Sequence, residues 1–424
     1  MKHADALSWS YIELTTREGD GEWFEVGEFL TPEDHDDPRF GEIALRFVML
    51  RAGSPDGRPP LLFLSGGPGE SAIEMLRHTA FRIHFRKASA NRDLILLDQR
   101  GIGRSERILP KEYAKHTPYD LVDPDEAYSM VYEQAARCRQ ELKPAFRPSC
   151  YTPTQSARDI AVLADALRLD RIDIWAHSYG THLTMAALKL IPERIGHVTL
   201  CGFEGPDQTF KLPSRVTAQL GRLAEHFATR DEWPDMLGDM ALVHGRLAEA
   251  PLTVRVASGE EIQVGLFGLQ WLVSSWIGLS GRFRRLPALY KSLRNGETAE
   301  LERAASGFVK MLDRRPPAFY LNDSASGATK KRLGRIAEES KTCLLANAIN
   351  FPFPKIREAW GQIDLGDAFR APLECDHTMR IVTGSLDGFT PTENARQSLD
   401  VLPNATLEEL PGLAHDDLLT AITP

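Results

Sequence analysis

The residues around Ser178 have the types and spacing of a serine nucleophile. The segment reads IDIWAHSYGTHLTMAALKL, in which a short apolar run (Ile172–Trp175) precedes small-x-Ser-x-Gly and a stretch with helical spacing (Tyr179–Leu190). A serine on a sharp turn between a strand and a helix projects its hydroxyl above the sheet, and such a turn requires small residues two positions before and after the serine. Gly180 fills one of these positions, and Ala176 fills the other in place of the more usual glycine. The pattern predicts that Ser178 is a nucleophile.

A serine hydroxyl needs a general base that is oriented by a carboxylate, and two residues near the end of the chain are suitably placed. Asp387 follows the apolar run Met379–Thr383, and His415 follows a strand-like run around Leu407. His415 is the only histidine downstream of that last run. The order serine, acid, histidine predicts a catalytic triad of Ser178, Asp387 and His415. Four other acids are rivals for the role of Asp387. Asp376 precedes the strand, Asp400 lies within a helix, and Asp416 and Asp417 adjoin His415.

Acyl transfer also needs N–H donors for the oxygen that becomes negatively charged. The backbone N–H of Tyr179, directly after the nucleophile, is the first expected donor. The second is expected in the loop LSGGPGES (Leu64–Ser71), whose glycines let the backbone approach a substrate closely. Gly67 is the residue we select there. An isolated Gly/Pro loop would be an ordinary turn, but this one follows a buried strand and lies upstream of Ser178.

Alternating strands and helices are predicted to position these groups. Short apolar runs without polar interruption are typical of strands buried on both faces. These runs are Leu61–Leu64, Asp93–Leu97, Ile172–Trp175 and His197–Cys201. Helical spacing begins near Ile73 and occurs again in Pro124–Leu142, Thr154–Leu167 and Tyr179–Leu190. The pattern predicts an α/β fold whose mostly parallel sheet has helices on both faces. The first 50 residues add three further strands, at Tyr11–Leu14, Trp23–Leu30 and Ile43–Leu50.

The alternation stops after Gly205, and residues 206–370 are mostly helical in pattern. Strands return at Met379–Thr383 and Thr406–Leu410. We therefore predict one α/β core, formed by residues 1–205 and 371–424, that is interrupted by a helical cap at 206–370. Two domains in series are the alternative, which is disfavoured because residues 371–424 are too short to fold alone.

Composition narrows the class of protein. The 424 residues carry a formal net charge of -9, which argues against a nucleic-acid partner. The sequence contains no run of about 18 apolar residues, so no membrane span is predicted. The absence of a visible secretory signal favours a cytoplasmic protein. Neither H-E-x-x-H nor clustered Cys/His spacing indicates a metal, and no cofactor is expected. Among the five cysteines, Cys138 and Cys150 are close enough in sequence to form a disulfide bridge, but the sequence does not decide whether they do. The sequence also does not determine the oligomeric state.

The motifs together resemble the prolyl iminopeptidase and tripeptidyl aminopeptidase group of α/β-hydrolases. The resembling segments are VGEFLTPEDH, LSGGPGES, LLDQRGIGRSE, YTPTQSARDIAVLADAL, AHSYGTHL, GSLDGFTP and GLAH. The resemblance implies the α/β-hydrolase fold, the same triad, a substrate admitted between cap and core, and hydrolysis of an amide near a peptide N-terminus. It also implies architectural roles for Asp98 and Arg100. Ser65 departs from the group, where histidine is frequent, whereas Cys138 and Cys150 match cysteines of its secreted members.

An enzyme that cleaves near a free N-terminus must hold a protonated amine, for which a carboxylate is the natural partner. Glu204 and Asp207 stand where the cap begins, and Glu70 stands beside the glycine loop. The cap also contains three basic runs, Gly281–Leu286, Arg314–Arg315 and Lys330–Arg335. They form either a solvated surface or an entrance for an acidic substrate. We expect a small molecule or short peptide as substrate. The same triad would serve an esterase or lactonase, and a binding protein that has lost the chemistry is a further alternative.

Overall fold

Nine strands form one central sheet in the computed structural model, which describes residues 7–108, 120–142, 145–312 and 315–424. The strands are β1 (Ser8–Thr15), β2 (Gly21–Pro32), β3 (Glu42–Leu50), β4 (Leu61–Leu64), β5 (Leu94–Asp98), β6 (Ile172–His177), β7 (Ile195–Cys201), β10 (Met379–Gly384) and β11 (Ala405–Leu410). Their order across the sheet is β1-β2-β3-β5-β4-β6-β7-β10-β11. The pairs from β1 to β5 are antiparallel, and all pairs from β5 to β11 are parallel. The predicted mostly parallel sheet is confirmed.

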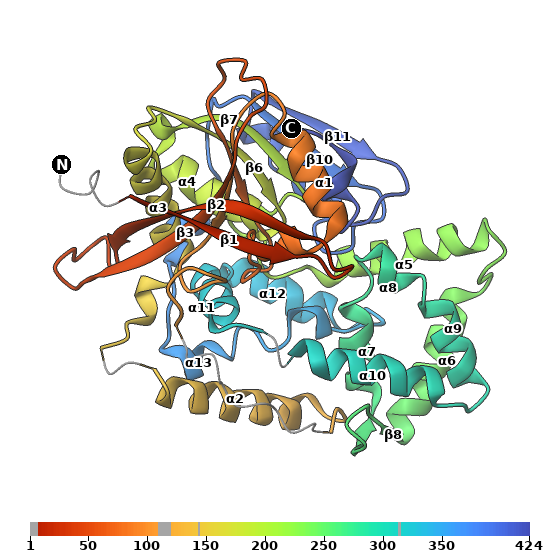
Figure 1. The fold of residues 1–424 in the computed structure, drawn as a ribbon. Coiled ribbons are helices and arrows are strands. Elements are labelled where there is room, and N and C mark those ends of the chain that lie inside the picture. Colours follow the sequence, from red (N-terminus) through yellow and green to blue (C-terminus); the bar gives the residue numbers. More distant parts are fainter. Residues whose placement is uncertain (1–6, 109–119, 143–144, 313–314) are drawn as a thin grey trace.

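Helices cover both faces of this sheet, which explains why its central strands are mostly apolar (Figure 1). The helices of the core are α1 (Thr79–Ala88), α2 (Pro124–Gln140), α3 (Pro153–Ala166), α4 (Tyr179–Leu190), α15 (Thr392–Arg396) and α16 (Leu418–Ala421). In β4, Leu61 and Phe63 pack with α1 and α16, whereas Leu62 and Leu64 pack with α3 and α4. Successive strand residues point to opposite faces, so a strand between two helical layers needs an apolar residue at every position.

The helix predicted from Ile73 begins later. Residues Glu74–Arg77 form a 3-10 turn, and α1 starts at Thr79 after His78 adopts an extended backbone. The glycine loop is thus followed by a tight turn and a bend before the helix that packs on the sheet.

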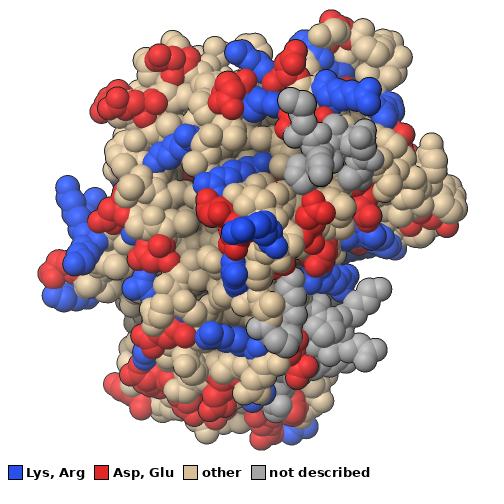
Figure 2. Space-filling view, turned by 90° about the vertical axis from the view of Figure 1, so that its left-hand side faces the viewer, with Lys and Arg blue, Asp and Glu red and all other residues tan. Residues whose placement is uncertain are grey.

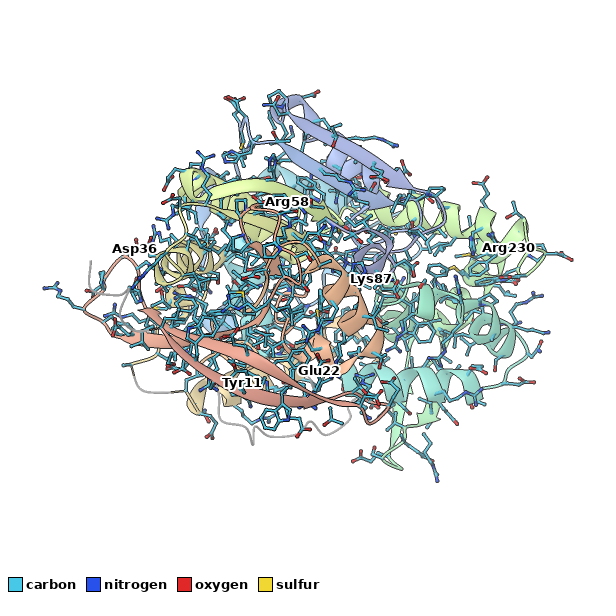
Figure 3. All side chains as sticks on the ribbon, turned by 45° about the horizontal axis from the view of Figure 1, so that its top comes forward. Tyr11, Glu22, Asp36, Arg58, Lys87 and Arg230 are labelled. Carbon is cyan, nitrogen blue, oxygen red and sulfur yellow. The ribbon has the colours of Figure 1, made fainter. Side chains whose placement is uncertain are left out.

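A mostly helical segment lies between β7 and β10, and we call residues 206–370 the cap (Figure 1). Its helices are α5 (Pro213–Ala228), α6 (Met236–Glu249), α7 (Leu266–Ser274), α8 (Ser280–Phe283), α9 (Leu286–Arg294), α10 (Ala299–Leu312), α11 (Pro317–Ser326), α12 (Lys330–Glu339), α13 (Arg357–Trp360) and α14 (Gly366–Arg370). One hairpin, β8 (Leu252–Arg255) and β9 (Glu261–Val264), interrupts them. Figure 3 shows Arg230, just after α5, on the opposite side of the molecule from Asp36 of the core.

Helix α2 packs with the cap, although it precedes β6 in the chain. Its buried Tyr128 and Val131 belong to the same apolar cluster as the cap helices. The Leu121 N–H donates to the Gln263 carbonyl at 2.7 Å, and the Tyr128 hydroxyl donates to the Lys355 carbonyl at 3.2 Å. The cap therefore has a wall that the core part of the chain supplies.

Two buried side chains of the DQRG motif organise the loops around the sheet. Arg100 forms a bidentate pair with Asp159 of α3, at 2.6 and 2.7 Å. Asp98 accepts from the Ser71 hydroxyl at 2.7 Å and from the Arg104 N–H at 2.8 Å, which ties the glycine loop to β5. Burial raises the pKa of Asp98 to about 6. These contacts agree with architectural rather than chemical roles for the motif.

Acidic and basic side chains are interspersed over the face shown in Figure 2. Within the basic runs of the cap and beside them, several residues have local partners. Arg335 pairs with Glu339 at 2.8 Å, Arg332 donates to the Phe210 carbonyl at 2.6 Å, and the Arg285 guanidinium lies 4.9 Å from the centre of the Trp276 ring. Of the basic run 314–315, Arg314 lies outside the described residues.

Cys138, Cys150, Cys201 and Cys343 are buried, and Cys375 is half-buried. Burial raises the pKa of the Cys150 thiol to about 12. A thiol that holds its proton so firmly is a weak nucleophile for disulfide exchange.

Candidate active site

Ser178 occupies a strained turn between β6 and α4. Its backbone has φ 55° and ψ -125°, a region that residues other than glycine rarely adopt. A Cβ added to Gly180 would lie 2.2 Å from the Leu64 carbonyl oxygen, and one added to Gly66 would lie 2.9 Å from the Ser178 Cβ. Ala176 is fully buried. The close approach of β4 and the glycine loop thus explains why glycine is needed after the serine, while alanine is accommodated before it.

Asp387 and His415 form a buried acid–base pair. The Asp387 Oδ2 accepts from His415 Nδ1 at 2.8 Å and from the Thr390 hydroxyl at 2.7 Å. Its Oδ1 accepts from the backbone N–H groups of Phe389 and Thr390, both at 2.8 Å. Burial by itself would raise the pKa of Asp387, but the charge of His415 and these hydrogen bonds outweigh it and lower the pKa to about 2. The carboxylate is therefore ionised and fixed in position.

The same pairing sets the state of His415. Burial by itself would lower the pKa of His415, but the charge of Asp387 and the hydrogen bond to it raise the pKa above its ordinary 6.5. Because Nδ1 donates to Asp387, Nε2 is left to take a proton. The His415 backbone is held by its N–H, which donates to the Gly278 carbonyl at 2.9 Å, and by its carbonyl, which lies 3.0 Å from His177 Nε2.

Ser178 and His415 line one cavity at the ends of β6 and β11. Within the described part of the chain, no hydrogen bond joins the two side chains. In unliganded active sites such bonds are often long and tighten only when substrate binds. The arrangement brings the three predicted triad residues to one site.

The glycine loop lies next to the serine. The Gly67 backbone has φ 109°, and its N–H has no hydrogen-bond acceptor among the residues that the structure describes. Tyr179 is the first residue of α4, where the N–H has no partner within its own helix. The Ser65 hydroxyl donates to the Glu70 carbonyl at 2.6 Å and closes the loop. Ser65 thus has a structural role in this loop.

Two cavities meet at Ser178. The first, of about 310 Å³, extends between the core and the cap and is lined by Tyr179, Glu204, Trp271, Phe319 and Asp323; we call it the cap cavity. The second, of about 470 Å³, is lined by His415, His177, His78, Phe81 and Asp416; we call it the His415 cavity. Gly67, Glu70, Ser178, Leu279 and Phe389 line both. A third cavity of about 630 Å³, between α2 and the cap, shares only Phe351 and Phe353 with the cap cavity.

Three carboxylates and two cations line the cap cavity. Glu204 is buried and pairs with Lys211; burial would raise the pKa of Glu204, but the charge of Lys211 outweighs it and lowers the pKa. Asp323 lines the same cavity, where the charges of Lys211 and Arg315 act on it, but among the described side chains it forms no ion pair. Burial, followed by the charge of Glu204, raises the pKa of Asp323 well above its usual range. Glu70 is solvent-accessible from the cavities, yet desolvation by the surrounding protein raises its pKa. The remaining cation is Arg315.

The structure separates the three predicted substrate-binding acids. Glu70 and Glu204 line the cap cavity. Asp207 does not, because its carboxylate accepts from the Thr329 N–H at 2.9 Å and the Thr329 hydroxyl at 2.8 Å, where it holds the start of α12. We therefore remove Asp207 from the candidate site.

Two further residues of the site, Thr390 and Asp323, are not predicted from the sequence. Thr390 follows Asp387 by three positions, a spacing typical of a turn closed by an aspartate side chain, so that signal was available. Asp323 lies within α11 of the cap, and no local pattern distinguishes it from a solvated acid.

No group of three or more His, Cys, Asp or Glu side chains suited to a metal ion occurs within residues 7–108, 120–142, 145–312 and 315–424. Over the same residues, no helix has the length and apolar character needed to cross a membrane.

Comparison with known proteins agrees with the fold. Residues 59–421 match the family described as alpha/beta hydrolase fold. The chain is 26% identical over 196 residues to a tripeptidyl aminopeptidase from Streptomyces coelicolor, and 25% identical over 194 residues to serine protease Hip1 from Mycobacterium tuberculosis. Each match covers 43% of this chain and 36% of the relative, so the chain matches about a third of the length of these relatives. The resemblance to the aminopeptidase group is thereby confirmed.

Solved structures of similar fold include a proline iminopeptidase and an esterase. The proline iminopeptidase, from Mycobacterium smegmatis, has 15% identity and a TM-score of 0.40, with 89% of each chain covered. The esterase, from Thermogutta terrifontis, has 13% identity and a TM-score of 0.41, with 97% of this chain and 93% of that chain covered.

Proposed function

Because the chain belongs to the α/β-hydrolase fold family, we propose that it is a serine hydrolase that cleaves amides near a free amino group, as an aminopeptidase does. The observation that carries the proposal is the pair of carboxylates, Glu204 and Asp323, in the cavity that adjoins Ser178. A carboxylate in a partly desolvated cavity is suited to a protonated amine, because charge-assisted hydrogen bonds are strongest there. The cap cavity, at about 310 Å³, suits a short acyl group.

The proposed reaction uses the triad in two steps. In the first, His415 Nε2 takes the proton of the Ser178 hydroxyl as Oγ bonds to the substrate carbonyl carbon. The N–H groups of Gly67 and Tyr179 stabilise the negative oxygen. His415 then gives the proton to the leaving nitrogen, the carbon–nitrogen bond breaks, and the acyl group stays on Ser178. In the second step water attacks the ester, His415 transfers the proton of water back to Ser178 Oγ, and the carboxylic acid leaves.

Asp323 is the carboxylate best suited to bind the substrate amine. Glu204 forms an ion pair with Lys211, whereas Asp323 forms no ion pair among the described side chains; Lys211 and Arg315 line the same cavity, but their charges do not outweigh the effect of burial on Asp323. Its raised pKa means that the empty cavity disfavours the charged form of the Asp323 carboxyl group. An arriving ammonium supplies the missing positive charge, so amine binding favours ionisation of Asp323.

A panel of aminoacyl-naphthylamides tests the proposal. We expect turnover of substrates with a free amino group and at least tenfold lower kcat/KM for their N-acetyl derivatives, because loss of a charged hydrogen bond costs about 1.5–3 kcal/mol. Asp323→Asn should remove most of that difference by slowing only the free-amine substrates. Asp376→Asn, which removes an equal charge at the opposite end of β10, is the control. Equal cleavage of free and acetylated substrates would overturn the amine-binding role.

Esterase activity on a small molecule is the second candidate, and the aromatic lining of the cap cavity favours it. Trp271, Phe319, Phe351, Phe353 and Phe389 form much of the wall, and such a surface suits an uncharged acyl group. Turnover of p-nitrophenyl esters without cleavage of any free-amine amide would select this function. Ser178→Ala is the control for both activities, because it should abolish each of them.

A further inference from the structure

The chemistry of acyl transfer assigns each of the two cavities to one half of the substrate. The base that takes the proton of the nucleophile must pass it to the leaving atom, so the leaving group lies where it can reach His415. His415 lines the His415 cavity and is not among the residues that line the cap cavity. The leaving group therefore occupies the His415 cavity, while the acyl group occupies the cap cavity. This assignment rests on the proposed acyl-enzyme mechanism.

The described walls of the His415 cavity combine apolar and acidic side chains. Phe81, Phe389 and Leu419 supply apolar surface, and no lysine or arginine is among the residues found to line it. His78 adds no fixed positive charge, because desolvation and then the nearby Arg17 lower its pKa.

Its acids differ in how far they are already neutralised. Glu74 is paired with Arg77 at 2.6 Å and with Arg104 at 2.8 Å. Asp416 is exposed and has no cationic partner among the described residues, but its carboxylate accepts from the Ser280 N–H at 2.8 Å. That bond fixes the carboxylate at the rim without cancelling its charge. Glu70, where the two cavities meet, adds a second unpaired acid within the described structure.

We propose that the His415 cavity is a leaving-group subsite selective for cationic amines, such as a peptide remainder that begins with lysine or arginine, and that Asp416 determines this selectivity. The alkyl part of such a side chain suits Phe81 and Leu419, and its charged end suits Asp416. Glu70 faces both cavities, whereas Asp416 lines only this one, so Asp416 separates leaving-group recognition from acyl recognition.

Competition between amines and water for the acyl-enzyme tests the subsite. The enzyme is first acylated from any ester or amide that it turns over. Either lysinamide or norleucinamide is then added; these two amines differ chiefly in the charge of the side chain. The neutral amine nitrogen attacks the Ser178 ester, His415 moves the proton of the amine to Ser178 Oγ, and the amide product forms with no other reactant. We expect lysinamide to be about fivefold more effective than norleucinamide, as for one exposed ion pair. Asp416→Asn should lower the ratio toward one, with any remaining preference due to Glu70, whereas Asp376→Asn should leave the ratio unchanged.

Equal partition of the two amines in the wild-type enzyme, or an unchanged ratio in Asp416→Asn, would overturn the subsite. High salt gives a test without substitution, because screening should lower the preference in the wild-type enzyme. A preference that salt does not change also counts against Asp416. The outcome is separable from that of the proposed aminopeptidase activity. If only esters acylate the enzyme, the peptidase proposal fails while the amine ratio still reports on the subsite.

Discussion

Replacing Ser178 by glycine should stabilise the protein while abolishing its activity. Ser178 has φ 55° and ψ -125°, and a residue with a Cβ in such a region costs on the order of 1–3 kcal/mol. Glycine adopts this region without that cost, but it loses roughly 0.5–1 kcal/mol through the greater freedom of its unfolded chain. The net gain for Ser178→Gly should be about 0.5–2 kcal/mol.

Ser178→Ala is the matched reference, because alanine removes the hydroxyl but retains the Cβ and therefore the strain. Urea unfolding of the wild type and both variants gives the comparison, and equal slopes would show that the same surface is exposed. We expect Ser178→Gly to be the more stable of the two variants and neither to turn over substrate. A glycine variant no more stable than the alanine variant would refute strain at Ser178.

A second substitution sharpens the same argument. A Cβ on Gly66 would lie 2.9 Å from the Ser178 Cβ, so Gly66→Ala should destabilise the protein. Part of this cost should disappear in the Ser178→Gly background, where the opposing Cβ is absent. The Gly66 position also faces the His177 carbonyl oxygen at 3.3 Å, so the rescue should be incomplete. A double-mutant cycle of the two substitutions measures this coupling, and additive losses would contradict the contact.

Further predictions concern the charges. In the proposed mechanism neutral His415 is the base, and Asp387 raises the pKa of His415, so kcat/KM should fall as pH drops through a value above 6.5. Asp387→Asn should move this fall in the pH profile to lower pH and reduce kcat by roughly 10⁴. Thr390→Val removes the 2.7 Å bond to Asp387 and should lower kcat/KM about tenfold in steady-state assays. Asp159→Asn leaves Arg100 buried beside a neutral amide and should lower the free energy of unfolding in urea by about 3–5 kcal/mol.

The grouping of Ser178, Asp387 and His415 at one site could be predicted because each of these residues is defined by a local pattern. Ser178 follows a run of buried residues and precedes a helix, so the requirement for small neighbours is visible in the sequence. Asp387 and His415 follow the last two strands of a parallel sheet, and the carboxyl ends of such strands meet at one edge. Chain order was therefore enough to select them from the other acids and histidines.

The cap could not be predicted in the same way. The direction of a side chain on a cap helix depends on how that helix packs, which local sequence does not determine. Asp207 and Asp323 illustrate this. The first stands at the expected rim but holds the start of α12, whereas the second lies inside α11 and faces the cavity. The packing of α2 against the cap was hidden for the same reason, since its apolar face fits a core helix equally well.

The division of the site between core and cap has a consequence for specificity. The His415 cavity, which is the proposed leaving-group side, is built largely from the glycine loop, α1 and the loop that carries His415, all parts of the core. The cap cavity, which is the proposed acyl side, is closed by α7, α11 and the residues around Phe351, all parts of the cap. Since Ser178, Asp387 and His415 lie in the core, changes in the cap should alter which acyl group is accepted while the partition of amines in the His415 cavity stays the same. Substitutions at Asp323 and Asp416 should therefore have additive effects on kcat/KM, because they act on opposite sides of Ser178.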